Sequence, residues 1–133
     1  METVSEVKPQ IGMSVSMGIG SDSYHQIIVK MERNAKTIYT LPARWVLKGI
    51  ELNDWNEMSE EIKANHASDV LQSALDSLKA EFPTMRDGWA LEYATKCYTY
   101  RATGRGAGRY AAKGDTYCWL TLDCQYQYLD PSF

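Results

Sequence analysis

The chain has 133 residues and a mass of 15.1 kDa, the size of a single domain spanning residues 1–133. A hydrophobic fraction of 44% and a charged fraction of 23% are ordinary for a globular protein and exclude a mostly disordered, collagen-like or disulfide-scaffold chain. No apolar run approaches the roughly 18 residues of a membrane-spanning helix, and the formal net charge of −3 argues against a general DNA-coating role.

The first third of the chain predicts a meander of three strands. Apolar residues alternate with small or polar ones over residues 11–17, as in a half-buried strand. Turn-forming residues separate this segment from two further β-prone segments, residues 24–32 and 36–41. One face of the second strand is expected to carry the apolar residues Ile27, Val29 and Met31.

The middle of the chain, residues 54–82, has the strongest helical pattern. Its apolar residues change phase, because the stripe that contains Trp55 lies on the opposite side of a helix from the stripe that contains Leu75. We therefore expect two helices, with a break at residues 65–68 and an end at Pro83.

The last third predicts two long strands, because residues 89–101 and 116–129 both alternate apolar with other residues. The segment between them, residues 102–115, reads as a long loop. The predicted fold class is α+β: a single antiparallel sheet, made of the N-terminal three-strand meander and the C-terminal long hairpin, with two central helices packed on one face.

Catalytic and metal-binding motifs are absent from the sequence. The two histidines, His25 and His66, are isolated, and no phosphate-binding loop or nucleophile motif is present. We therefore expect no catalytic residue, no metal site and no cofactor, and a non-enzymatic function is favoured. The N-terminal residues lack the pattern of a secretory signal, so we expect a cytoplasmic protein whose three cysteines pack as thiols: Cys97, Cys118 and Cys124.

The segment 101–113 combines glycines with a cation at every fourth position. Arginines offer forked donors that match phosphate or carboxylate groups, and a tyrosine can stack on a nucleobase. One interpretation is a phosphate-binding or partner-binding loop, and the other is a flexible tip kept soluble by its charges. The candidate residues of this loop are Arg101, Arg105, Arg109, Tyr110 and Lys113.

A second candidate surface is acidic. Residues 51–92 hold ten Asp/Glu and three Lys/Arg, and the acids gather at the expected start of the helices. Acids there stabilise a helix through its dipole, or they present an anionic face to a basic, nucleic-acid-binding partner. The candidate residues of this face are Asp54, Glu57, Glu60 and Glu61.

The aromatic composition is skewed, with four Trp and nine Tyr against two Phe. Tyr and Trp are favoured at interfaces because they bury a ring and keep a polar group. On the predicted C-terminal hairpin, one face carries aromatic residues that form an exposed interaction surface, or else close a second small core or a dimer. These residues are Tyr98, Tyr100, Tyr117 and Trp119.

A compact chain that is rich in Tyr and Trp, locally acidic and without catalytic motifs resembles small accessory proteins of phages and mobile elements. That resemblance implies a non-enzymatic binding protein, such as a phage-type, anti-CRISPR-like inhibitor of host defence, which docks on a host protein or nucleoprotein complex. The alternative is a small nucleotide or nucleic-acid binding protein that uses the loop 101–113. We expect no membrane partner, and a homodimer is compatible with the sequence.

Overall fold

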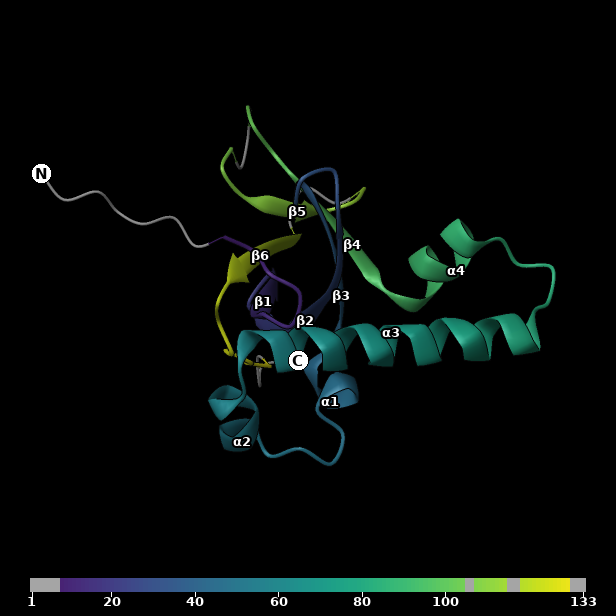
Figure 1. Ribbon diagram of the computed structural model, residues 1–133. Helices are drawn as coiled ribbons and strands as arrows, with labels where there is room; N and C mark the ends of the chain where they lie inside the picture. The colour runs from purple at the N-terminus through teal and green to yellow at the C-terminus, as the bar shows by residue number, and fades with distance from the viewer. Residues whose placement is uncertain (1–7, 105–106, 115–117, 130–133) are drawn as a thin grey trace, which may run out of the picture.

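The computed structural model describes residues 8–104, 107–114 and 118–129. Its centre is a closed antiparallel barrel in which each strand pairs with the next along the chain and the last pairs with the first (Figure 1). The six strands are β1 (Ser14–Ile19), β2 (Asp22–Glu32), β3 (Thr37–Pro42), β4 (Lys96–Tyr100), β5 (Tyr110–Ala112) and β6 (Cys118–Leu122).

The helices form one insertion between β3 and β4. They are α1 (Ala43–Val46), α2 (Leu52–Glu57), α3 (Glu60–Glu81) and α4 (Asp87–Ala94). The long helix α3 crosses the barrel with its first half and extends beyond it with its second half, where α4 lies alongside (Figure 1).

The predicted open sheet with two helices on one face is therefore wrong. Strand β1 pairs with β6 as well as with β2, so the sheet closes on itself and has no free edge. Closure creates an interior, which is filled by apolar side chains including Val15, Ile38, Tyr98 and Leu120. A second core lies outside the barrel, where the helices cover β2 and β3 and where Cys97 of β4 also packs.

A β-bulge in β2 decides which residues face each core. The pairing with β3 shifts between Ile28 and Lys30, so that Val29 is an extra residue in the ladder. Val29 packs with Ile27 against the helices, whereas Met31 packs against the barrel interior with Ile28. The expectation that Ile27, Val29 and Met31 share one face is thus wrong for Met31, because the bulge reverses the alternation.

The helical region does contain a break, but the break does not lie at residues 65–68. It lies at Met58 and Ser59, between α2 and α3, and α3 then runs without interruption for 22 residues. The Ser59 hydroxyl accepts a hydrogen bond of 3.2 Å from the Ile62 amide and so caps α3. The apolar stripe changes phase because Trp55 belongs to α2, which ends just before Met58.

Both predicted C-terminal strands are shorter than expected. Residues 89–94 belong to α4, since the spacing of Trp89 and Tyr93 by four also fits a helix. Strand β6 ends at Leu122, and the following residues, 123–129, form a strap that pairs once with β2 through Ser23 and Tyr128. Strand β5 interrupts the predicted loop 102–115.

Candidate functional site

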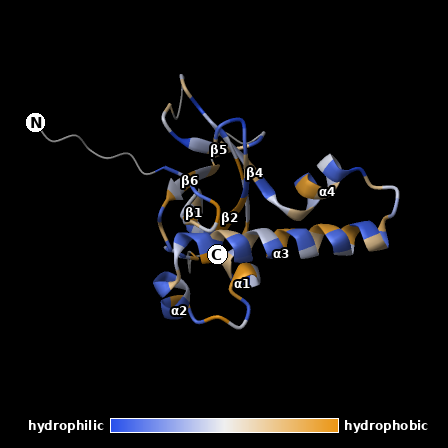
Figure 2. Cartoon of the chain, in the orientation of Figure 1, coloured by the Kyte–Doolittle hydropathy of each residue, from blue (hydrophilic) through white to orange (hydrophobic). Residues whose placement is uncertain are grey.

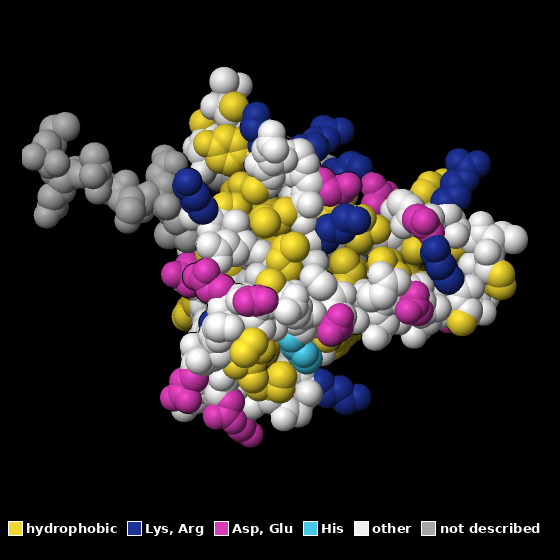
Figure 3. All heavy atoms as spheres, viewed as in Figure 1, with side chains coloured by type: hydrophobic (Ala, Val, Ile, Leu, Met, Phe, Trp, Pro, Cys, Tyr) yellow, Lys and Arg dark blue, Asp and Glu magenta, His cyan; other side chains and the backbone are white. Residues whose placement is uncertain are grey.

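The four acidic candidates come together at the junction of α2 and α3, which we call the acidic corner: Asp54, Glu57, Glu60 and Glu61. All four side chains are exposed. Within the described part of the chain, none of them forms an ion pair. Figure 3 shows acidic groups over α2 and the start of α3. The corner is therefore a concentration of uncompensated negative charge.

The corner is held in place by contacts on the inner side of α2. Trp55 is 1% exposed and packs edge-on against His66 of α3, with 5.6 Å between ring centroids. The His66 ring donates a hydrogen bond of 2.6 Å from Nε2 to the Val46 carbonyl. Asn56 and Gln125 exchange amide hydrogen bonds of 2.5 and 3.3 Å, which tie α2 to the strap. These contacts fix α2 to α1, α3 and the strap.

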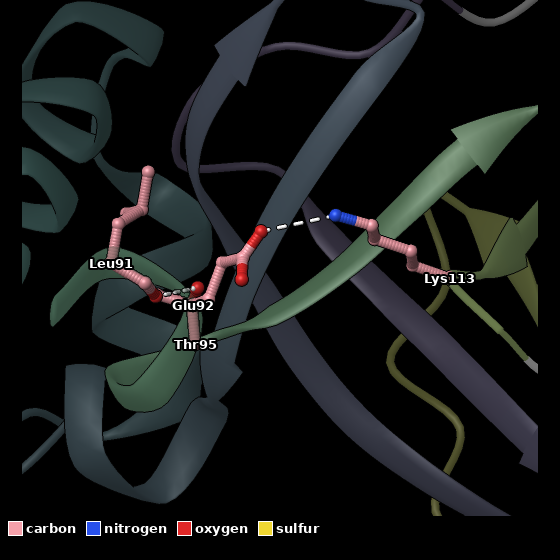
Figure 4. Close-up of polar contacts among 4 residues, drawn as sticks. All are labelled: Leu91, Glu92, Thr95 and Lys113. Carbon is pink, nitrogen blue, oxygen red and sulfur yellow. Dashed lines mark hydrogen bonds and ion pairs between the residues drawn. The ribbon is translucent and has the colours of Figure 1, made fainter. Parts of the chain in front are cut away.

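The basic candidates do not form one cluster. Arg101 and Arg109 lie at one end of the β4–β5 pair, where Arg101 N donates to Arg109 O at 2.9 Å. Lys113 follows the other end of β5, where it donates from Nζ to Glu92 of α4 at 3.0 Å (Figure 4). This contact raises the pKa of Lys113, chiefly through the hydrogen bond to Glu92. Arg105 lies outside the described residues.

Lys113 and Glu92 join β5 to the end of α4. In Figure 4, Thr95 lies one turn after Leu91, at the end of α4, and its hydroxyl donates a 2.5 Å hydrogen bond to the Leu91 carbonyl, which also accepts from the Thr95 amide at 3.1 Å. Both charged side chains are largely exposed, and such pairs contribute little stability. Lys113 is therefore an exposed link between β5 and α4.

Arg101 and Arg109 have a basic neighbour that the sequence did not indicate, Lys36. The β2–β3 turn packs against the β4–β5 hairpin, because Tyr100 N donates to Lys36 O at 2.8 Å. We call the resulting group the basic tip: Lys36, Arg101 and Arg109. The charge of Arg33, in the same turn, acts instead on Lys113, where it opposes the rise in the pKa of that lysine. The two turns are far apart in sequence, so only the paired strands bring them together. Figure 3 shows basic side chains in this upper region.

Tyr110 is not available to stack on a base. It is 9% exposed, and its hydroxyl donates a 2.6 Å hydrogen bond to the carbonyl of Ala35. Burial raises the pKa of Tyr110. Its ring meets Tyr100 edge-on at 5.4 Å. Tyr110 is thus a structural clamp between the hairpin and the β2–β3 turn, which corrects its assignment as a ligand-stacking residue.

The aromatic candidates that the structure describes do not share one exposed face. Tyr98 is fully buried in the interior of the closed barrel. Burial raises the pKa of Tyr98 above its ordinary range. Trp119 is half-buried beneath Arg101, whose guanidinium carbon lies 5.9 Å from the ring centroid. Tyr100 is exposed, and Tyr117 lies outside the described residues.

The two most exposed aromatic residues of the described chain lie elsewhere, on α4, where Trp89 and Tyr93 are 70% and 73% exposed. Tyr126 of the strap is 56% exposed, and Trp45 of α1 is 54% exposed. The sequence holds one signal for them: Trp89 and Tyr93 are four residues apart and share a face if the segment is read as a helix. The prediction of a strand over residues 89–101 did not use this spacing.

His25 and Ser14 form the closest pair of a basic ring and a hydroxyl, with 2.9 Å between Nε2 and Oγ. Ser14 is 7% exposed and lies beneath the strap, whose Gln125 side chain also donates to Ser14 Oγ at 3.4 Å. The pair therefore presents no nucleophile to solvent. Burial lowers the pKa of His25.

We expect the lowered pKa of His25 to make stability fall in mild acid. The unfolded chain, with the ordinary histidine pKa of 6.5, binds a proton more readily than the folded one. The stabilisation is thus complete above that pH and is lost as the pH falls below it. Urea unfolding between neutral and mildly acidic pH measures the effect. His25→Asn should show a weaker pH dependence than the wild type; an unchanged dependence would contradict this role.

Other classes of site receive no support in the described part of the chain. No group of three or more His, Cys, Asp or Glu side chains there could hold a metal ion. None of the helices in those residues has the length and apolar character that crossing a bilayer requires. Cys97, Cys118 and Cys124 form no disulfide. Comparisons with known protein families, curated proteins and solved structures gave no match.

Proposed function

We propose that the protein is a non-enzymatic binding protein that docks its acidic corner on a basic surface of a host protein or nucleoprotein complex. A phage-type, anti-CRISPR-like inhibitor of host defence would act in this way, by covering a surface that otherwise binds nucleic acid. The observation that carries the proposal is the acidic corner itself: four exposed carboxylates without ion pairs among the described residues, on a corner fixed by buried contacts.

The charge arrangement supports binding in physical terms. Complementary charge steers diffusional encounter and penalises partners of like charge. A corner that is already held by Trp55 and Asn56 loses little conformational freedom on binding. Fixed, unpaired carboxylates therefore favour a protein surface of opposite charge as the partner.

The test compares two triple substitutions of equal charge. Glu57, Glu60 and Glu61 of the corner are changed to Gln in one variant. The matched control changes exposed acids elsewhere: Glu32→Gln, Asp69→Asn and Asp76→Asn. Partners captured from host lysate by the wild type are purified, and their association rates are measured at several salt concentrations.

We expect the corner variant to associate about tenfold or more slowly and to lose most of the salt dependence, since steering acts mainly on the association rate. The control variant should keep the association rate of the wild type and its salt dependence. Free nucleic acid should compete with the protein for its partner. Equal binding by the two variants, or no competition, would contradict the proposal.

A second function, nucleic-acid binding, is favoured by one observation: the fold adds Lys36 to Arg101 and Arg109 at the basic tip. Three cations could contact several phosphates, and the affinity would then fall steeply with salt. A labelled single-stranded oligonucleotide tests this directly. Tight binding at physiological salt that is lost when all three are changed to Gln would favour this function over the first.

A further inference from the structure

The second half of α3 and all of α4 form an arm beside the barrel (Figure 1). The buried residues of α3 are Ala67 and Leu71, both in the part that crosses the barrel. Beyond them, α3 packs against α4 through Ala90 and Leu91, and Lys79 forms an ion pair with Asp87. Apolar residues nevertheless recur along α3 to its end (Figure 2). The arm is therefore only two helices thick, with apolar groups still facing solvent.

One side of the arm holds a groove of about 270 Å³ between α1, α3 and α4. Its floor is made by the small side chains of Ala74 and Ser77, next to Leu78. Its walls include the exposed rings of Trp45 and Tyr93. Large rings and a floor of small residues thus lie within one patch.

The charges at the two ends of the groove have opposite signs. Glu81 lines the end that is distant from the barrel. Arg44 and Lys48 are exposed beside Trp45, at the end near the barrel. Two copies related by a two-fold axis and packed antiparallel would place Glu81 of each copy near the Arg44 side chain of the other.

The two rings that line the groove supply part of the area that a dimer needs. Trp45 and Tyr93 are 54% and 73% exposed, and aromatic side chains bury about 150–250 Å² each. They supply roughly 250 Å² of the about 800 Å² that each partner buries in a stable interface. A two-fold dimer would take the rest from the exposed surfaces of α1, α3 and α4 around the groove.

We propose that a second copy of this chain occupies the groove, forming a two-fold dimer through the arms. A two-fold interface uses the same patch on both subunits, so the patch must contain both members of each contact pair. The groove and the surface beside it do so twice. Exposed rings lie next to a floor of small side chains, and the acid Glu81 of the lining has a counterpart in the base Arg44, which precedes Trp45 in α1. Trp45 and Tyr93 of one copy pack over Ala74 and Ser77 of the other.

Sedimentation velocity over a range of micromolar protein concentrations tests the dimer. The wild type is expected at twice the 15.1 kDa chain mass. Ser77→Arg places a long charged side chain on the groove floor and should give monomers, while far-UV circular dichroism stays unchanged because Ser77 is exposed. Ser68→Arg is the matched control, an exposed position on the opposite face of α3, and should stay dimeric.

A charge exchange tests the two-fold arrangement. Glu81→Arg should weaken the dimer about tenfold, and adding Arg44→Glu in the same chain should restore it. A wild type that is monomeric throughout would overturn the proposal, as would a dimer that persists in Ser77→Arg. Capture of an unrelated protein by a monomeric wild type through this groove would equally overturn it. The acidic corner lies outside the groove, so the corner variants should remain dimeric whichever way the function test turns out.

Discussion

Replacing Gly12 with alanine is expected to destabilise the protein by about 2–4 kcal/mol. Gly12 has a φ of +92°, where an L-residue is strained. An added Cβ would also lie 2.8 Å from the carbonyl carbon and Cβ of Lys63, and 2.9 Å from the Ala64 nitrogen. Two of these three atoms are backbone atoms of α3, so the contact is relieved only if the helix moves away from the barrel.

Urea denaturation followed by tryptophan fluorescence measures the effect. Gly18→Ala is the matched control, because it has no positive φ and its added Cβ would meet nothing within 4 Å. That variant should stay within about 0.5 kcal/mol of the wild type. A Gly12→Ala protein as stable as the Gly18→Ala protein would contradict the close approach of α3 to the chain just before β1.

Removing the ring of Trp55 should have a similar or larger effect. Trp55→Ala is expected to lower the free energy of unfolding by about 3–5 kcal/mol, as for other fully buried large residues. Trp55 is 1% exposed and meets the His66 ring edge-on. Its loss leaves a cavity beneath α2, and we expect the amides of α2 to exchange with solvent faster than those of β2.

The control for Trp55 distinguishes packing from a general effect of changing α2. Leu52→Ala alters a side chain on the same helix that is 38% exposed, so we expect a loss of about 1 kcal/mol or less. Trp55→Phe keeps an aromatic ring, so its loss of free energy of unfolding should lie between those of Trp55→Ala and Leu52→Ala. A Trp55→Ala variant no less stable than the Leu52→Ala variant would show that Trp55 does not anchor α2.

Local patterns predicted the parts of the protein whose contacts are local. The strands over residues 22–32 and 37–42 were expected within a few residues. The acidic corner was expected because its members lie within residues 54–61, where neighbouring turns of helix bring them together. The chemistry of that corner could thus be read from the sequence, although the position of the helix break could not.

Long-range contacts decided what the sequence could not show. Apolar and polar residues alternate along a strand in the same way whether the sheet is open or closed into a barrel. The sequence therefore does not show the burial of Tyr98, which depends on the pairing of β1 with β6. The basic tip depends on the packing of Lys36 beside a hairpin that is distant in sequence. The pattern around Trp89 fits a strand and a helix equally, and the contact between α3 and α4 selects the helix.

The pairing of β1 with β6 also sets the order of events during synthesis. The barrel joins Val15 to Leu122, so the ring of strands cannot close until Leu122 has left the ribosome. Such distant pairings slow folding, because a long loop must be ordered before they form. The β2–β3 hairpin and α3 have emerged by then, with their shared core. A truncation just before β6 would therefore expose β1 and β5 as unpaired edges, where chains aggregate.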